Sequence, residues 1–179
     1  MDHDRYDDAY IADILGKVRT IAMVGASANI NRPSFFAMKY LIGKNYRVVP
    51  VNPTLAGKDI LGQRVAASLA EVESPVEMVD IFRNSEAALE VTREALAEKD
   101  RLGLKVVWMQ LSVRNDEAAA EAEAAGLEVV MNRCPKIEYG RLSGEIGWMG
   151  INAGVISSKR ALLGAGVQNQ MIGGVRPKR

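Results

Sequence analysis

The sequence predicts an α/β protein with a doubly wound, mostly parallel Rossmann-like sheet and helices on both faces. Two observations carry this prediction. Apolar runs alternate along the chain with stretches of helical spacing, which is the order of successive βαβ units. The apolar runs are also nearly continuous, as in strands that are covered on both faces of a parallel sheet. Right-handed crossovers between such strands place helices on both sides.

The first part of the chain is expected to contain two of these strands. Apolar residues at helical spacing predict an entry helix over Asp7–Lys17, and the first strand follows at Thr20–Gly25. The next helix is expected to begin near Pro33, because proline is favoured in a first helical turn. A second strand is predicted at Tyr46–Val51. The turn-rich segment after it is expected to lead into a short edge strand around Arg64–Val65.

Three more strands are predicted in the second part, at 76–82, 104–109 and 127–131. Asn84 or Ser85 is expected to cap a long helix that runs to about Lys99. An alanine-rich helix is predicted over 115–125 and is ended by Gly126, since glycine is common just after a helix. Residues 134–143 are compatible with a further helical turn.

We expect one Rossmann-like domain over residues 1–150, with its core at 20–137, and a glycine-containing basic extension at 151–179. A chain of 179 residues is long enough to bury a core without disulfides or metals. Residues 157–179 contain lysine and arginine but no acidic residue. This pattern favours a solvated chain end, and a dimerisation arm is the alternative.

Composition predicts a cytoplasmic protein that binds neither nucleic acid nor membrane. The formal net charge of +1 lacks the basic excess of nucleic-acid-binding domains. No stretch approaches the roughly 20 apolar residues of a membrane span, and the acidic N-terminus is unlike a signal peptide. The single cysteine, Cys134, fits a reducing compartment.

The turn after the first strand predicts a phosphate-bearing, nucleotide-like ligand. In doubly wound sheets, ligands bind beyond the carboxyl ends of the strands, at the point where the strand order reverses. Here Gly25 opens a polar turn that leads to a helix start, where backbone N–H groups and the helix dipole favour an anion. Arg32 adds a guanidinium group suited to bidentate phosphate contacts.

The same turn argues against a nicotinamide dinucleotide. The dinucleotide fingerprint has three glycines after the first strand and an acid about 20 residues further on. After Gly25 the second and third glycines are missing, and Asn52 ends the second strand in place of the acid. The phosphate loop of P-loop proteins is absent as well. NAD(P) therefore remains only an alternative.

Six short blocks of sequence, in order along the chain, closely resemble the small single-domain coenzyme A-binding proteins. These proteins are similar to the N-terminal domain of the succinyl-CoA synthetase α subunit and of ADP-forming acyl-CoA synthetases. The resemblance covers residues 20–137 and excludes the C-terminal extension. The blocks are Gly25–Ser27, Arg32–Ser34, Val49–Pro53, Val79–Arg83, Val107–Gln110 and Asn132–Lys136.

The resemblance implies coenzyme A (CoA) or an acyl-CoA as the cofactor, and it implies a residue-by-residue site. The diphosphate would lie against one group of residues, the adenosine and its 3′-phosphate against a second, and the pantetheine arm against a third. These groups are Gly25, Ala26, Ser27, Arg32, Pro33 and Ser34 for the diphosphate; Val51, Asn52 and Pro53 for the adenosine, with Lys58 for the 3′-phosphate; and Phe82, Arg83, Trp108 and Gln110 for pantetheine.

Several of these residues have a structural alternative. Ser27 would then only stabilise its turn, and Arg32 would pair with a surface acid. Lys58 would be a solvated loop lysine. Arg83 would cap or salt-bridge locally, and Trp108, within an apolar run, would belong to the core.

Cys134 has two interpretations. Arg133 and Lys136 would favour its thiolate, which would suit a mixed disulfide with the thiol of CoA. A lone cysteine is more commonly a small buried hydrophobic residue.

The sequence indicates a binding module rather than a complete enzyme. The only histidine is His3, so neither a phosphohistidine step nor a Ser–His–Asp arrangement has a candidate, and no metal-ligand spacing occurs. We expect a carrier, sensor or non-catalytic module for CoA or acyl-CoA. The alternatives are an NAD(P)-binding oxidoreductase or redox sensor, and the CoA-binding subunit of a multi-chain acyl-CoA ligase. The protein partners expected are a second copy of the chain or a ligase subunit.

Overall fold

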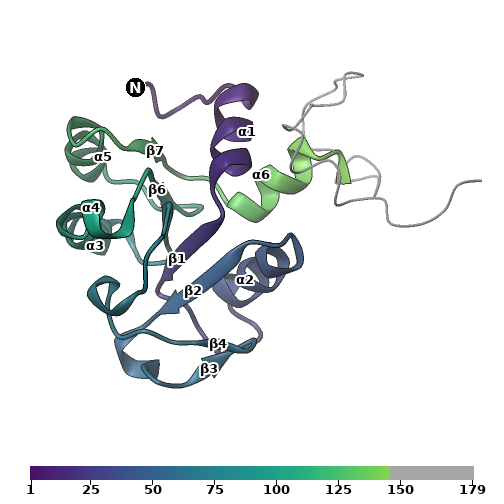
Figure 1. Ribbon diagram of the computed structural model, residues 1–179. Helices are drawn as coiled ribbons and strands as arrows, with labels where there is room; N and C mark the ends of the chain where they lie inside the picture. Colours follow the sequence, from purple (N-terminus) through teal and green to yellow (C-terminus); the bar gives the residue numbers. More distant parts are fainter. Residues whose placement is uncertain (146–179) are drawn as a thin grey trace, which may run out of the picture. The chain divides into compact units, whose positions relative to one another are not determined.

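The computed structural model describes residues 1–145, which divide into two compact units (Figure 1). One unit is Val18–Lys136 and contains the sheet. The other consists of Met1–Lys17 and, among the described residues, 137–145. The basic extension expected at 151–179 lies outside the described residues.

The sheet has five strands in the order β2-β1-β5-β6-β7, and every neighbouring pair is parallel. The chain passes from β1 to β2 at one edge and then returns to the other side of β1, where β5 begins a run toward β7. The strand order therefore reverses between β1 and β5, as the predicted doubly wound fold requires. The strands are β1 (Thr20–Val24), β2 (Arg47–Val51), β5 (Met78–Ile81), β6 (Val106–Met109) and β7 (Glu128–Val130).

Helices cover both faces of the sheet, which confirms the predicted fold class. Helix α2 (Pro33–Gly43) lies on one side, while α3 (Ser85–Ala97) and α5 (Asp116–Ala124) lie together on the other (Figure 1). The short helix α4 (Lys99–Leu102) follows α3. The predicted helix start at Pro33 is confirmed, because Pro33 is the first residue of α2.

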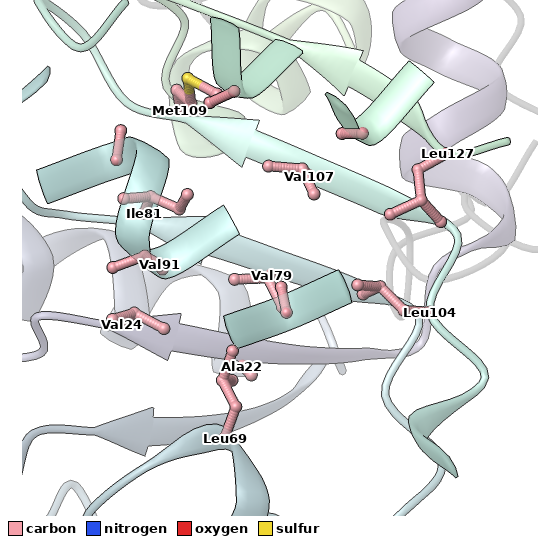
Figure 2. Close-up of a cluster of buried hydrophobic side chains, with 14 of the residues drawn as sticks. Ala22, Val24, Leu69, Val79, Ile81, Val91, Leu104, Val107, Met109 and Leu127 are labelled. Atoms are coloured by element: carbon pink, nitrogen blue, oxygen red, sulfur yellow. The ribbon is translucent and has the colours of Figure 1, made fainter. Parts of the chain in front are cut away.

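Alternate strand residues on the α3 and α5 side form one hydrophobic core (Figure 2). Val79 and Ile81 of β5 contribute to it, and so does Val91 of α3. Successive side chains of a strand point to opposite faces. Asp80, between Val79 and Ile81, therefore faces the side of the sheet that α2 covers.

Thr92 on α3 is completely buried, and its hydroxyl oxygen has no hydrogen-bond partner among residues 1–145. A buried hydroxyl without a partner costs free energy, whereas valine has nearly the same shape and helix propensity. Thr92→Val should therefore raise the free energy of unfolding by about 1 kcal/mol, measured by urea denaturation. Thr92→Ser keeps the hydroxyl and loses the methyl group, so it should lower stability by about 1 kcal/mol. A Thr92→Val variant less stable than the wild type would contradict the conclusion that the Thr92 hydroxyl is buried without a hydrogen-bond partner.

Asparagine side chains cap the two helices on the core side. Asn84 accepts a hydrogen bond from Ala87 N (3.0 Å), which makes Asn84 rather than Ser85 the cap of α3. Asn115 accepts one from Ala118 N (2.9 Å) at the start of α5. The helix predicted to run to Lys99 instead ends at Ala97, and α4 starts after a break at Glu98.

The edge beyond β2 is a hairpin rather than a regular strand. Strands β3 (Asp59–Ile60) and β4 (Gln63–Arg64) pair with each other in a separate antiparallel sheet. A parallel bridge between Val51 and Ala66 joins the following residues to β2. The expected edge strand around Arg64–Val65 is thus present only as β4 and this single bridge. Two single-turn helices, at Pro53–Leu55 and Leu69–Glu71, flank the hairpin.

The described part of the other unit contains α1 (Asp8–Lys17) and most of α6 (Pro135–Leu142). Arg141 joins these segments through ion pairs with Asp8 and Glu138, both at 2.7 Å. The helical turn anticipated near residues 134–143 is therefore a helix of two turns.

Candidate functional site at the carboxyl edge of the sheet

Four strands end together at one edge of the sheet. Val24 is in register with Val51 on one side and with Ile81 on the other, and Ile81 is in register with Met109. The next residue of each strand therefore emerges at the same edge. These residues are Gly25, Asn52, Phe82 and Gln110, all of which the sequence predicts as site residues.

Gly25 makes the closest approach at the reversal of strand order. Its φ angle is +87°, and its N–H donates to the carbonyl oxygen of Val51 (2.9 Å). A Cβ atom at this position would lie 2.6 Å from the carbonyl oxygen of Phe82. Both the backbone conformation and the contact with β5 therefore require glycine here.

The loop after Gly25 is held by short polar turns. The Ser27 hydroxyl oxygen accepts a hydrogen bond from Asn29 N (3.2 Å), and the Asn29 side chain accepts one from Asn31 N (2.9 Å). Ala26 is buried. Ser27 thus stabilises its turn, as its structural alternative requires, while its hydroxyl hydrogen remains available for a ligand.

The loop ends at the N-terminus of α2. Arg32 occupies the cap position without capping through its side chain, Pro33 follows as the first helical residue, and Ser34 is buried. The first turn of α2 contains no acidic residue. The positive end of the helix dipole is therefore not neutralised locally.

Two exposed arginines, Arg32 at the cap of α2 and Arg83 just beyond β5, belong to this edge of the sheet. Neither Arg32 nor Arg83 has a side-chain hydrogen bond or ion pair among the described residues. The Arg83 Cδ atom lies 3.0 Å from the position of a Cβ on Gly25, so its side chain passes over the turn. Local ion pairing, the alternative for both arginines, is thus not seen within residues 1–145. Arg83 thus lies beside the turn at Gly25, whereas the sequence resemblance implies a place along the pantetheine path.

Asn52 ties the end of β2 to this turn. Its Nδ2 donates to the carbonyl oxygen of Ala26 (2.8 Å), and its Oδ1 accepts from the backbone N–H and the hydroxyl of Thr54. Val51 is buried beside it, and Pro53 is exposed. Lys58, further along the same connection, is also exposed, and its side chain has no partner within the described residues.

The residues predicted along the pantetheine path lie at two depths. Phe82 is half-buried at the edge of the sheet. Trp108 is completely buried, and its indole N–H donates to the carbonyl oxygen of Arg133 (2.7 Å), which favours the core interpretation. Gln110 is largely buried, and its Nε2 donates to both carboxyl oxygens of Asp80, at 2.8 and 3.1 Å.

Asp80 is not among the site residues that the sequence predicts. It is completely buried in the central strand β5, and burial raises the pKa of its carboxyl group to about 8, against the opposing effect of the Gln110 hydrogen bond. The sequence contains one signal for it, namely a single acidic residue inside an otherwise apolar strand. A buried carboxyl group with a raised pKa at the ligand edge of a sheet is a candidate functional group.

Cys134 is buried just beyond β7. This burial favours the interpretation as a small hydrophobic residue, and the mixed disulfide stays a prediction. His3 lies in the other unit, where its ring nitrogen Nδ1 is 2.9 Å from the Tyr6 hydroxyl. Residues 1–145 contain no cluster of three His, Cys, Asp or Glu side chains that would hold a metal ion. Within the same range, no helix has the length and apolar composition needed to cross a membrane.

The strand order and the glycine turn place the protein among the doubly wound α/β domains that present a site at the carboxyl ends of their strands. Residues 19–140 match the family described as "CoA binding domain". The chain belongs to this family.

Similar proteins are known from bacteria and archaea. The protein YneT of Bacillus subtilis (strain 168) is 34% identical over 131 residues, which are 73% of this chain and 93% of YneT. A solved structure of a hypothetical protein from Pyrococcus horikoshii OT3 is 37% identical, with a TM-score of 0.71 over 78% of this chain and 94% of that one. A structure from Thermus thermophilus is 34% identical, with a TM-score of 0.70 over 76% and 98% of the two chains.

A larger synthetase shares the fold. The dinucleotide-forming acetyl-coenzyme A synthetase 1 of Ca. Korarchaeum cryptofilum aligns with a TM-score of 0.53 and 22% identity. The alignment covers 63% of this chain and 25% of the synthetase. The resemblance to CoA-binding domains of acyl-CoA synthetases, inferred from six sequence blocks, is thereby confirmed at the level of family and fold.

Proposed function

We propose that the protein binds CoA or an acyl-CoA at the carboxyl edge of its sheet and acts as a carrier, a sensor or another non-catalytic binding module. The observation that carries this proposal is the approach of the Arg83 side chain to Gly25, with Arg32 at the cap of α2 in the same loop, in a member of the CoA-binding domain family. Neither arginine has a side-chain partner among residues 1–145, and cations beside a glycine turn and at a helix N-terminus suit a diphosphate.

The diphosphate is the best-defined part of the proposed site. Gly25 lets the backbone approach the ligand closely, and the N-terminus of α2 adds its dipole. Arg32 and Arg83 would contact the phosphate oxygens from either side of the turn. This assignment moves Arg83 from the pantetheine path, where the resemblance puts it, to the diphosphate.

The remaining parts of the ligand extend from the turn in opposite directions. The adenosine would lie toward β2, beside Val51, Asn52 and Pro53, with exposed Lys58 available for the 3′-phosphate. The pantetheine arm would run across the ends of β5 and β6, past Phe82 and Gln110. Trp108 would support this surface from below through its bond to the Arg133 carbonyl.

Arg32→Ala should weaken CoA binding at least tenfold, because a charge-assisted hydrogen bond contributes about 1.5–3 kcal/mol. Isothermal titration calorimetry with CoA measures the loss, and native mass spectrometry of the purified protein tests for retained CoA. Arg47→Ala is the matched control. Arg47 is an exposed arginine at the opposite end of β2 and pairs with Glu73 (3.7 Å), so its loss should leave the affinity unchanged.

Two outcomes would contradict different parts of the proposal. Equal CoA affinity in Arg32→Ala and the wild type would remove Arg32 from the diphosphate site. A wild-type protein that binds NADH tightly and CoA weakly would overturn the choice of ligand and favour the oxidoreductase or redox-sensor alternative.

A further inference from the structure

We propose that the Gln110 side chain contacts the pantetheine arm of the ligand, and that buried Asp80 determines which end of the Gln110 amide faces that ligand. Asp80 is a positioning residue in this arrangement because it acts only through Gln110. The inference rests on the proposed function, since it assumes CoA or acyl-CoA in the site.

Gln110 lies at the carboxyl edge of the sheet, where the proposed ligand binds. It follows β6 directly, and its backbone is fixed on both sides: its N–H donates to Ile81 (3.4 Å), and its carbonyl accepts from Val113 N (2.9 Å). The backbone therefore leaves the terminal amide as the variable part of this residue.

The two ends of that amide have different surroundings. Nε2 points inward and donates to Asp80. Oε1 has no hydrogen-bond partner among residues 1–145. It is also not one of the completely buried side-chain atoms in that range, so it is accessible to a ligand. Oε1 is thus the end of the amide left to meet a ligand.

The protonation state of Asp80 decides whether this orientation persists. An ionised carboxylate only accepts hydrogen bonds, so it holds Nε2 inward and leaves Oε1, an acceptor, facing the ligand. A protonated carboxyl group donates its O–H, and Oε1 is the acceptor within reach once the amide rotates by half a turn. Nε2 then faces outward as a donor. The proton on Asp80 therefore reverses the hydrogen-bonding polarity that Gln110 presents.

The surroundings of Asp80 allow this change near neutral pH. Burial raises the pKa of its carboxyl group to about 8. In register with it on β1 and β6 are Met23 and Trp108, neither of which is charged. Several titratable residues within 18–136 lie on the same side of the sheet, and none of them hydrogen-bonds to Asp80. They are Lys39, Tyr40 and Lys44 of α2 and its end, Tyr46 just before β2, Glu128 of β7, and Cys134 and Lys136 beyond β7.

The ligand should bind more tightly when Asp80 is protonated. An outward Nε2 donates to a pantetheine carbonyl, whereas an inward Nε2 leaves only the acceptor Oε1 at that position. Raising the pH through about 8 reverses this orientation. Affinity should therefore fall as the pH rises.

The test measures acetyl-CoA affinity by calorimetry between pH 7 and pH 9.5, because acetyl-CoA has no free thiol that titrates in this range. We expect at least a threefold loss of wild-type affinity centred near pH 8, and a flat profile for Asp80→Asn. Cys134→Ser removes one of the other titratable side chains named above, and it should keep the wild-type pH profile.

Two further measurements separate Gln110 from simple charge repulsion and do not depend on the folding of Asp80→Asn. Gln110→Leu should bind more weakly and show a flat profile, whereas repulsion by Asp80 alone would leave the pH dependence in place. In the wild-type protein, the ¹³C carboxyl resonance of Asp80 should titrate near pH 8. A midpoint below pH 5, or a pH-dependent Gln110→Leu variant, would overturn the inference.

The same measurements distinguish a failure of the proposed function from a failure of this inference. A wild-type protein that binds no acetyl-CoA at any pH overturns both. Tight binding with the same pH profile in the wild type and Asp80→Asn overturns only the role of Asp80.

Discussion

Asp80→Asn should make the protein more stable than the wild type at alkaline pH and leave its stability little changed in acid. The Asp80 carboxyl group is completely buried in β5, and burial raises its pKa to about 8. Asparagine has nearly the same shape and can still accept the hydrogen bond from Gln110, but it carries no charge at any pH. The substitution therefore removes the cost of a buried carboxylate and keeps the packing.

The direction follows from the proton balance of folding. A carboxyl group whose pKa is raised in the folded state binds more protons in the folded than in the unfolded protein. Its contribution to stability is therefore complete below the unfolded pKa of about 4, and it is lost as the pH rises through about 8. Each pH unit between these values lowers the free energy of unfolding by about 1.4 kcal/mol. The wild type should thus lose roughly 4 kcal/mol relative to Asp80→Asn between pH 5 and pH 8.

Urea denaturation of both proteins at pH 5, 7 and 9 measures this difference directly. Asp59→Asn serves as the control, because Asp59 is an exposed carboxyl group on β3. Its stability curve should run parallel to that of the wild type. A constant difference between Asp80→Asn and the wild type from pH 5 to pH 9 would mean that Asp80 is ionised throughout and that its carboxylate is stabilised in the fold.

The fold could be predicted from the sequence because its signals are local. The predicted helix start at Pro33 and the helix end at Gly126, whose φ angle is +81°, depend on residues close in the chain. The sequence does not decide between Asn84 and Ser85 as the cap of α3, since either side chain can accept the hydrogen bond. The break at Glu98 carries no local signal, because both flanking segments consist of good helix formers.

The candidate site was less predictable because it depends on contacts between strands. Gly25 and Arg32 lie within one turn, and the sequence identifies them together. Arg83 reaches that turn only because β5 pairs with β1, and Asp80 meets Gln110 only because β5 pairs with β6. Spacing along the chain does not encode such pairs. Trp108 is the opposite case, because its place within an apolar run of the sequence is enough to predict that it is buried in the core.

Together these contacts connect the ligand edge with the interior of the sheet. The glycine turn and its two arginines form the exposed part of the candidate site, and the Asp80–Gln110 pair forms its buried part. In the proposed arrangement, a proton on Asp80 changes the hydrogen-bonding group that Gln110 presents to the ligand.

Gly25→Ala should both destabilise the fold and weaken CoA binding. Alanine at a φ angle of +87° costs about 1–2 kcal/mol. Its Cβ would also lie 2.6 Å from the Phe82 carbonyl oxygen, and that peptide cannot move freely because Phe82 N donates to Val24 O (2.8 Å). We expect the free energy of unfolding to fall by about 3 kcal/mol or more. The new methyl group would also displace Arg83, so the affinity for CoA should fall at least tenfold.

Two other glycines separate the causes of this loss. Gly103 has a φ angle of +72° but open space around its Cβ position, so Gly103→Ala should cost only about 1 kcal/mol, the conformational part. Gly43, the last residue of α2, also has open space, and Gly43→Ala should be neutral or stabilise by up to about 1 kcal/mol. Urea denaturation of the three variants should thus give a graded series, with CoA affinity lost only in Gly25→Ala. Equal losses of stability in Gly25→Ala and Gly103→Ala would show that the contact between the turn and β5 is not tight, and the close approach that defines the proposed diphosphate site would have to be abandoned.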